Sequence, residues 1–459
     1  MARHVVDPTS MHRYTDETER VARAALAYAR DRLRLHPVPL DGPRTRDELT
    51  ELAGATITED GLGGEGAMRV FADVLAPATI SIDNPRFLAF IPAAPTELSM
   101  MFDLVVGASS IYGGTWMEAS GAVYAENQAL EWIAALAGLP ESAAGCFVSG
   151  GTVGNLSALV AARHAHRAAN GATGGARLRA LCTDETHSSV ATAAAVMDVD
   201  LLRVSPDGRG RMTGEGLAAA LDRDGGEGVF AVVATAGTTN LGAIDDLDGI
   251  AAVCEERGLW MHVDGAYGGA ALAAPSVRDR FAGVEHADSF IVDPHKWLFA
   301  PFDSCALLYR RPELARAAHT QQAGYLEAVQ GSEWNPSDYA VHLSRRARGL
   351  PFWFSLAAHG TRAYTEAIEH TLEVARQAAD EIRARPYVEL LNEPELTVLV
   401  LRRPGWEAAD YTAWTGRLLA EGVAFVTPTT HAGETVTRFA IVNPRTTLAD
   451  ISAILDTLA

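Results

Sequence analysis

The chain of 459 residues contains one lysine, Lys296, and the other 37 of its 38 Lys and Arg residues are arginines. A surface cation needs only its charge, which arginine supplies, but a guanidinium stays protonated and cannot form a Schiff base. Lys296 lies in the segment 292–297, directly after the apolar residues Phe290 and Ile291. We interpret Lys296 as a covalent catalyst that forms an imine with an aldehyde cofactor. A leftover surface lysine is the alternative.

A second candidate is Asp264, which ends an apolar run in the segment 262–269. A carboxylate is costly to bury without a partner, and a protonated pyridine nitrogen is a suitable partner. The small side chain of Ala266 leaves room for a flat ring above it. Because 32 residues separate Asp264 from Lys296, both can stand at strand ends of one sheet. The alternative for Asp264 is a helix-capping residue in a turn.

Two further segments offer groups for an anion and for a ring. The turn 149–155 contains Gly151 and Thr152, where glycine allows close approach and a helix N-terminus offers free N–H groups. His187 follows another predicted strand, so its imidazole can lie against a flat cofactor ring. An ordinary glycine-rich turn and an incidental histidine are the alternatives. Together the four segments supply the amine, carboxylate, phosphate cradle and flat slot that pyridoxal phosphate requires.

The elements that must position these groups alternate along the chain. Strands are predicted over 146–148, 178–183, 229–235 and 259–264, and helices over 19–35, 120–137, from the glycine turn to 169, over 187–197 and over 247–256. Apolar strands that alternate with amphipathic helices indicate an α/β fold with a mostly parallel sheet covered on both faces. Open sheets of this kind bind ligands at the carboxyl ends of their strands, where the four segments fall.

Three parts are predicted: a helical segment over 1–80, a large cofactor-binding domain over 81–350 and a small α+β domain over 351–459. In the last part we expect one long helix over 352–383, a strand over 396–401, a helix over 409–420, strands near Val423 and Arg438, and a final helix from Leu448.

Composition narrows the class of protein. The net charge of −20 argues against a nucleic-acid or anionic-membrane partner. No apolar run is long enough for a transmembrane helix, and the N-terminal residues contain no apolar signal region. The four cysteines are scattered, which favours reduced core residues in a cytoplasmic protein and gives no support to a metal site.

The same segments resemble a known family, the group II pyridoxal-phosphate amino-acid decarboxylases. The resemblance rests on the motifs Phe147-Val148-Ser149-Gly150-Gly151-Thr152, Thr186-His187-Ser188-Ser189, His262-Val263-Asp264-Gly265-Ala266-Tyr267 and Asp293-Pro294-His295-Lys296-Trp297. It runs from about residue 84 to residue 447 and so covers most of the chain.

The resemblance implies a fold-type I architecture, like that of aspartate aminotransferase, and a homodimer with shared active sites, on whose partner subunit residues 1–80 pack. It implies the following roles: Lys296 as the Schiff-base lysine, Asp264 on the pyridinium, His187 stacked on the ring, Ala266 on the opposite face, Gly151 and Thr152 on the phosphate, Thr239 near the cofactor, and His295 before the lysine.

The resemblance also implies a reaction. The substrate amine displaces Lys296, carbon dioxide leaves, and a proton returns to Cα before the amine product departs. Tyr325 matches the family's proton donor on a mobile loop, and residues 330–336 read as a closing lid. Family members that produce aldehydes often carry phenylalanine at this position, so Tyr325 together with His187 favours simple decarboxylation.

Substrate choice is less defined. The family walls the substrate side chain with aromatic residues, and the matching positions here are Phe90, Pro92, Tyr112 and, in place of a tryptophan, Ile82. Arg345 matches a family arginine and is expected to be structural or to face the substrate carboxylate. This thinner wall favours an indole or another bulky apolar side chain, and Arg86 is the one candidate cation for an acidic substrate.

Three hypotheses remain open. The first is decarboxylation of an L-amino acid, with aromatic substrates favoured. The second is an aldehyde synthase, transaminase or lyase that uses the same cofactor. The third is a cofactor-binding protein without turnover.

Overall fold

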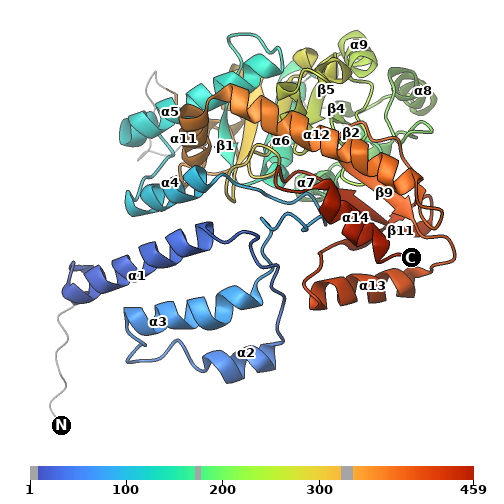
Figure 1. Ribbon diagram of the computed structural model, residues 1–459. Coiled ribbons are helices and arrows are strands. Elements are labelled where there is room, and N and C mark those ends of the chain that lie inside the picture. The colour runs from blue at the N-terminus through green and yellow to red at the C-terminus, as the bar shows by residue number, and fades with distance from the viewer. Residues whose placement is uncertain (1–8, 171–176, 322–333) are drawn as a thin grey trace.

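A computed structural model describes residues 9–170, 177–321 and 334–459, which form two sheets surrounded by helices (Figure 1). The helices are α1 (Asp16–Leu33), α2 (Arg46–Ala53), α3 (Gly64–Val70), α4 (Glu97–Ala108), α5 (Trp116–Leu136), α6 (Gly151–Asn170), α7 (Ser188–Met197), α8 (Gly214–Asp224), α9 (Leu247–Arg257), α10 (Pro312–His319), α11 (Leu350–His359), α12 (Thr361–Arg383), α13 (Ala408–Ala420) and α14 (Leu448–Asp456). The strands are β1 (Ala144–Val148), β2 (Arg179–Cys182), β3 (Asp200–Arg203), β4 (Val229–Thr235), β5 (Trp260–Asp264), β6 (Ser289–Val292), β7 (Cys305–Tyr309), β8 (Glu389–Leu390), β9 (Val398–Arg402), β10 (Thr427–His431) and β11 (Glu434–Ala440).

The larger sheet has seven strands in the order β1-β7-β6-β5-β4-β2-β3. All of them run parallel except β7, which pairs antiparallel with β1 on one side and β6 on the other. The central strand β4 is buried along its whole length, which explains its uninterrupted apolar sequence. The predicted α/β fold with a mostly parallel sheet is confirmed, and β4 has the predicted bounds.

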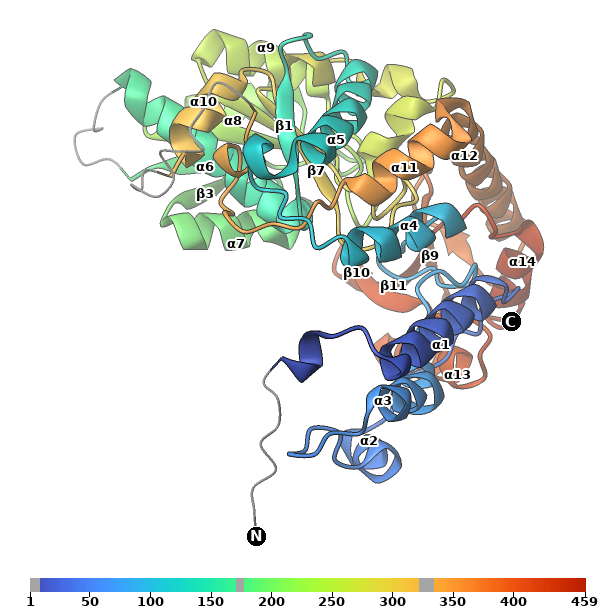
Figure 2. The same ribbon diagram turned by 90° about the vertical axis from the view of Figure 1, so that its left-hand side faces the viewer.

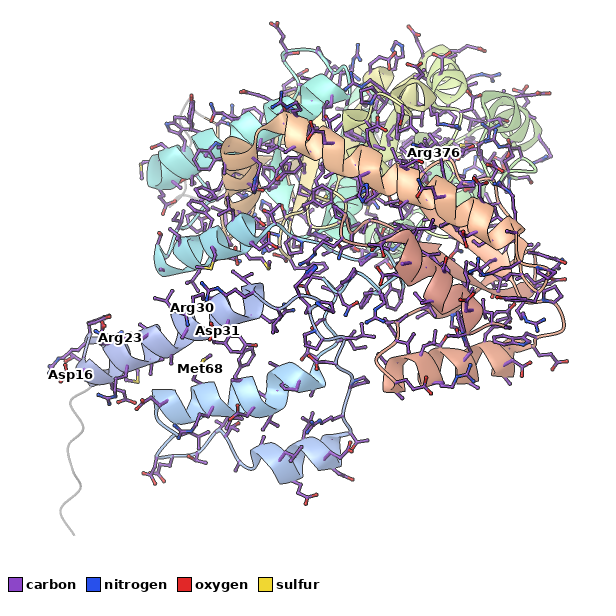
Figure 3. The ribbon with its side chains drawn as sticks, viewed as in Figure 1. Asp16, Arg23, Arg30, Asp31, Met68 and Arg376 are labelled. Atoms are coloured by element: carbon purple, nitrogen blue, oxygen red, sulfur yellow. The ribbon has the colours of Figure 1, made fainter. Side chains whose placement is uncertain are left out.

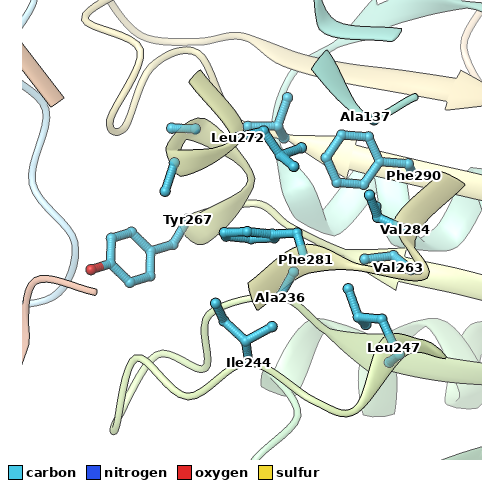
Figure 4. Packing of buried hydrophobic residues seen from close by; sticks show 14 of the residues in the cluster. Ala137, Ala236, Ile244, Leu247, Val263, Tyr267, Leu272, Phe281, Val284 and Phe290 are labelled. Carbon is cyan, nitrogen blue, oxygen red and sulfur yellow. The ribbon is translucent and has the colours of Figure 1, made fainter. Parts of the chain in front are cut away.

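Helices cover both faces of this sheet. In β1, Cys146 and Val148 pack into a cluster with α6, α7 and α10, whereas Phe147 faces the opposite cluster with α5, α8 and α9. Figure 4 shows part of this second cluster, with Phe281 and Phe290 among its rings and with the hydroxyl of Tyr267 pointing away from them. The strands therefore hold their ends in fixed positions, as an active site at the sheet edge requires.

The C-terminal part differs from the prediction at two points. The expected helix over 352–383 is two helices, α11 and α12, separated by Gly360 with φ of +77°. A Cβ at Gly360 would meet nothing within 4 Å, so the backbone conformation rather than space requires glycine there. The strand expected near Val423 begins later, as β10 at Thr427, because the Val423 amide donates to the Leu418 carbonyl at 2.9 Å and closes the end of α13.

The small sheet has four antiparallel strands in the order β10-β11-β9-β8. It carries the predicted strand around Arg438, and the predicted helices over 409–420 and from Leu448 are α13 and α14. Helix α11 begins at the predicted boundary of 350 but packs on α4 and α5 of the preceding part. The division into parts at residues 80 and 350 therefore stays a prediction.

The N-terminal helices α1, α2 and α3 contain no buried residue within the chain. In Figures 1 and 2 they stand apart from the two sheets, and Figure 3 shows Met68 of α3 in the space between α1 and α3. Capping boxes at Thr15 and Thr45 begin α1 and α2. Arg32 joins this segment to the rest through an ion pair with Asp83 at 2.8 Å.

No helix in the described ranges is both long and apolar enough to cross a lipid bilayer.

A buried histidine in the contact between α10 and α6 makes stability depend on pH. The Nε2–H of His319 donates to the Ser157 carbonyl at 3.0 Å. Burial lowers the pKa of His319 to about 4 from its ordinary 6.5, so the folded protein holds this imidazole neutral. The unfolded chain takes up the proton first as the pH falls, and stability present above pH 6.5 is therefore lost between pH 6.5 and pH 4.

We expect His319→Gln to retain the donor and to remove this loss, which is worth about 3 kcal/mol at pH 4. Thermal unfolding followed from pH 8 to pH 4 measures the difference in slope. The exposed His370 of α12 gives the matched variant His370→Gln, which should keep the wild-type slope. Equal slopes for His319→Gln and the wild type would contradict the assignment.

Candidate active site

A cavity of about 210 Å³ opens at the carboxyl ends of the parallel strands. It is lined by Gly150, Gly151, Thr152, Asn155, His187, Ser189, Thr235, Gly237, Thr239, Asp264, Ala266, Tyr267, Asp293, His295 and Lys296. All eight residues that the sequence predicted to hold a cofactor are among them. Strands β1, β2, β4, β5 and β6 end at this edge, which is why motifs far apart in the sequence meet here.

Lys296 stands in the connection between β6 and β7, beside a carboxylate. Its Nζ lies 2.9 Å from Asp293 Oδ2. Burial alone would lower the pKa of Lys296, but the charges of Asp293 and Asp264 outweigh burial and raise it. The pKa of Asp293 is correspondingly held below its ordinary value, although burial opposes this. Asp293 is thus the nearest charged partner of the amine, a role that its place in the quoted motif had not revealed.

His295 is fixed by the same connection. Its Nδ1 accepts a hydrogen bond from the Ser304 amide at 3.0 Å, so the ring proton of the neutral imidazole is on Nε2. That Nε2 lies 3.6 Å from Asp293 Oδ2. Burial lowers the pKa of His295 despite the nearby Asp293 charge. The ring also packs against Phe302, with ring centroids 4.7 Å apart.

Asp264 ends β5 with a side chain that is 4% exposed. Its Oδ1 accepts from the Ala266 amide at 3.1 Å, and its Oδ2 accepts from Asn155 Nδ2 at 2.8 Å. A carboxylate has about four acceptor positions, so both oxygens keep capacity for one more donor. The helix-capping alternative is not observed, since the only backbone amide bonded to the Asp264 side chain among the described residues belongs to the turn at Ala266.

The turn before α6 forms a cradle for an anion. Gly151 is the first residue of this 20-residue helix, whose first amides have no partner within the helix. A Cβ on Gly151 would lie 3.3 Å from the Ala266 Cβ and 3.4 Å from Asp293 Oδ2. The close approach of three segments therefore favours glycine at this position. The free N–H groups and the Thr152 hydroxyl can bind a phosphate at this position.

His187 caps the N-terminus of α7 and is exposed toward the cavity it lines. Its Nδ1 accepts from the Ser189 amide at 3.2 Å and lies 2.8 Å from Ser189 Oγ. An amide can only donate, so the neutral imidazole carries its proton on Nε2. His187 is therefore the N-cap of α7, and its stacking on a cofactor ring stays a prediction.

The residues expected to bind the substrate side chain do not line this cavity in the described ranges. Phe90 is 56% exposed, has φ of +54° and packs near Phe425 at 6.1 Å between ring centroids. Pro92 is buried, Ile82 is half-buried in a separate cluster, and the Tyr112 hydroxyl donates to the Leu343 carbonyl at 3.0 Å.

Of the two roles expected for Arg345, its contacts support the structural one. Its Nη1 and Nη2 bind Glu126 Oε2 and Oε1 at 2.8 and 2.9 Å, and both side chains are at most 2% exposed. Glu126 also accepts from the Gly349 amide at 2.8 Å and so fixes the start of α11. Arg345 is therefore a structural residue and does not face the substrate.

We expect Arg345→Met to lower the free energy of unfolding by about 3–5 kcal/mol, because Glu126 would be left as an uncompensated buried charge. Urea unfolding monitored by circular dichroism measures the loss. The neighbouring Arg346 pairs with Asp103 while 37% exposed, so Arg346→Met should cost about 1 kcal/mol or less. A loss for Arg345→Met no larger than this control would contradict the assignment.

The residues present fit pyridoxal phosphate. Two buried polar atoms at the cavity, Thr235 Oγ1 and Asp293 Oδ1, have no hydrogen-bond partner, as groups that await a ligand would. A lone lysine, a carboxylate, a helix N-terminus and an imidazole are the groups that bind this cofactor in its enzymes. No cluster of three or more metal-ligating side chains occurs in the described part of the chain.

Fold and site together define an α/β enzyme of the pyridoxal-phosphate type. Residues 56–403 match the family model described as the pyridoxal-dependent decarboxylase conserved domain. The chain therefore belongs to the pyridoxal-dependent decarboxylase family, and it is a pyridoxal-phosphate-dependent amino-acid decarboxylase.

Known relatives agree with this family. The chain is 30% identical over 432 residues to an aromatic-L-amino-acid decarboxylase of Bacillus atrophaeus, covering 91% of this chain and 88% of the relative. It is 32% identical over 411 residues to an L-2,4-diaminobutyrate decarboxylase of Rhizobium meliloti strain 1021, covering 86% and 82%. The crystal structure of Oryza sativa TDC with PLP and tryptamine shares the fold, with a TM-score of 0.89, 24% identity and 99% coverage of each chain.

Several residues at the site were not assigned from the sequence. Ser189 and His262 lie within the quoted motifs and Asn155 lies in the turn 149–155, but their hydrogen bonds depend on contacts between distant segments. Tyr325 and most of the expected lid over 330–336 lie outside the described residues.

Proposed function

We propose that the enzyme decarboxylates an aromatic L-amino acid to the corresponding amine and carbon dioxide. The observation that carries the proposal is the meeting of Lys296, Asp264 and His187 in one cavity. The exposed Phe90, whose ring centroid lies 6.1 Å from that of Phe425, is a candidate wall for an aromatic side chain. Relatives at 30% identity that are named aromatic-L-amino-acid decarboxylases support it as well.

The roles proposed for the residues follow from their chemistry. Pyridoxal phosphate, when bound, supplies an electron sink for the bond that breaks at Cα. Lys296 holds the cofactor covalently and gives way to the substrate amine. Asp264 keeps a proton on the ring nitrogen, because its buried carboxylate favours a cationic neighbour. His187 presents its ring to the cavity in the neutral form.

The remaining groups bind the cofactor phosphate, shape the cofactor slot and return the proton to Cα. The amides at the start of α6, with Thr152, bind the phosphate, and Thr239, Ala266 and His295 shape the slot. We assign the return of the proton to Tyr325, as the family resemblance implies. With this tyrosine present, the product is an amine and not an aldehyde.

We also propose a homodimer with shared active sites. Helices α1 to α3 bury no residue within one chain, yet they carry exposed apolar side chains such as Leu26 and Leu52. Apolar surface of this kind marks a protein interface. A partner subunit that covers these helices would bring further side chains to the substrate pocket, which accounts for the incomplete wall in one chain.

One observation favours a second candidate substrate, an amino acid with an acidic side chain. Arg438 on β11 is 4% exposed, and its buried Nη1 has no partner. Val436 and Ala440, on the same face of β11, pack in one cluster with Tyr267, which lines the cavity. Burial lowers the pKa of Arg438 to about 10, as for a cation that has not found its anion. A substrate carboxylate is a suitable partner.

A panel of amino acids decides between these functions. The enzyme is incubated with tryptophan, tyrosine, phenylalanine, histidine, 2,4-diaminobutyrate, glutamate and aspartate, and amine, carbon dioxide, ammonia and hydrogen peroxide are measured. The proposal expects amine and carbon dioxide in equal amounts, fastest with an aromatic substrate. Fastest turnover of glutamate or aspartate supports the second candidate. Ammonia and peroxide without amine would instead show an aldehyde synthase.

A further inference from the structure

Hydrogen bonds around Asp264 extend well beyond the cavity. Asn155 Nδ2 lies 2.8 Å from Asp264 Oδ2 and 2.9 Å from Ser189 Oγ, and Asn155 Oδ1 lies 2.8 Å from His262 Nε2. On the other side of the imidazole, His262 Nδ1 lies 2.8 Å from Ser289 Oγ, which accepts from Trp260 Nε1 at 2.8 Å. This network thus connects α6 with two strands, β5 and β6, and with α7.

The direction of each bond in this network can be assigned. An ionised Asp264 only accepts, so the NH₂ group of Asn155 must face it and the Asn155 carbonyl must face His262. His262 therefore donates from Nε2 and accepts at Nδ1. The indole of Trp260 only donates, so the hydroxyl proton of Ser289 is free to point at His262 Nδ1. With these directions, every donor in this hydrogen-bond network faces an acceptor.

Burial holds this arrangement in place. His262 and Asn155 are 0% and 1% exposed, and Ser289 is 1% exposed. Burial lowers the pKa of His262 to about 4, with Asp264 opposing the shift, so the imidazole stays neutral at neutral pH. Turning the amide of Asn155 over would place its oxygen against the Asp264 carboxylate and its NH₂ group against the Nε2–H of His262. Buried polar groups left unpaired in this way are costly.

The same amide reaches the other catalytic group. Ser189 Oγ accepts from Asn155, so its own proton is directed at His187 Nδ1, 2.8 Å away. The Ser189 amide donates to that nitrogen as well. Nδ1 of His187 is thereby the accepting nitrogen, and the orientation of the ring is fixed by Ser189. The Asn155 amide therefore positions both the Asp264 carboxylate and, through Ser189, the His187 imidazole.

We propose that Asn155 is the positioning residue of this site: its amide, locked in one orientation by His262, aims Asp264 at the cofactor ring and, through Ser189, sets the direction of His187. This inference rests on the roles proposed above for Asp264 and His187. It assigns Asn155 and His262 no contact with the reacting atoms. Their effect is to fix the position of the Asp264 carboxylate relative to the His187 imidazole.

The test compares variants that keep or lose the hydrogen bonds. Asn155→Ala removes the shared amide. His262→Phe fills the same space without an N–H donor, whereas His262→Gln restores a donor for Asn155 Oδ1. Asn443 is the matched control, because it is also a buried asparagine (2% exposed) but binds the Asp83 carbonyl away from the cavity. Each variant is measured for the cofactor dissociation constant, for kcat and KM, and for the thermal midpoint without cofactor.

We expect Asn155→Ala and His262→Phe to weaken cofactor binding and to lower kcat by about 10-fold or more each, with little change in KM. His262→Gln should recover most of both, and Asn443→Ala should change only the thermal midpoint. Wild-type kcat and cofactor affinity in Asn155→Ala, or equal impairment of His262→Gln and His262→Phe, would overturn the inference. Asp264→Asn is measured as well. If this variant were unimpaired, the role proposed for Asp264 would be refuted, and that failure is distinct from a failure of the inference about Asn155.

Discussion

A chain with Lys296→Arg is expected to lose turnover of every amino acid by roughly 10⁴-fold or more. Arginine keeps the charge beside Asp293, 2.9 Å from the native amine, and so preserves the electrostatic environment of the connection between β6 and β7. It cannot form the covalent link to an aldehyde, because a guanidinium does not give up its proton. Product formation measured by mass, together with the absorbance of the bound cofactor, tests this result.

The single lysine makes the covalent link directly visible. Borohydride reduction of the loaded enzyme should attach one cofactor per chain, in the peptide that contains Lys296. The control is Arg311→Lys, which adds a second amine at an exposed position (57% exposed side chain) outside the cavity. That variant should still be labelled only at Lys296. A Lys296→Arg chain that retained both the cofactor absorbance and turnover would refute the role of the lysine.

Asp264→Asn is expected to lower kcat by roughly 10²–10⁴-fold and to weaken cofactor binding. The side chain keeps its size and can still accept from the Ala266 amide. It loses the negative charge that holds a proton on the ring nitrogen, and its NH₂ group would face either that nitrogen or the NH₂ group of Asn155. Steady-state kinetics at saturating cofactor separates the loss in kcat from the loss of cofactor.

The matched control is Asp288, which lies at the opposite end of the same strands. Its carboxylate accepts from the Met261 amide at 3.0 Å and pairs with Arg311. Asp288→Asn removes one carboxylate from the sheet edge that lacks the cavity and should leave kcat unchanged. If Asp264→Asn retained kcat within a few-fold of the wild type, the ring nitrogen would have another partner.

The sequence predicted those helices and strands that have a clear hydrophobic period or a clear terminating residue. The strand over 229–235 is uninterrupted and apolar because both of its faces are covered, and β4 has these bounds. The sequence could not show that β7 runs antiparallel, since its residues Cys305–Tyr309 read like any other buried strand. Strand direction depends on the path of the chain between strands, which composition does not record. Likewise, Gly360 within an apolar helical pattern did not reveal that two helices meet there.

The cofactor site was predicted better than the substrate site for a physical reason. Residues that hold the cofactor lie within short motifs at strand ends, so their roles follow from local sequence. The sequence left two roles open for Arg345 and could not decide between them, because its partner Glu126 is 219 residues away. The same holds for Asn155 and His262, whose hydrogen bond spans 107 residues. Contacts between distant segments become visible only when the fold is known.

Helices α1 to α3 have no buried residue within the chain, so under the proposed association their order would depend on enzyme concentration. A helix of 7 or 8 residues, such as α3 or α2, is marginal in water without packing. Under the proposed association, these helices would be secured only in the assembled pair, and dilution would loosen them while both sheets stayed folded. The substrate pocket would then depend on enzyme concentration, and the cofactor cavity, which a single chain completes, would not.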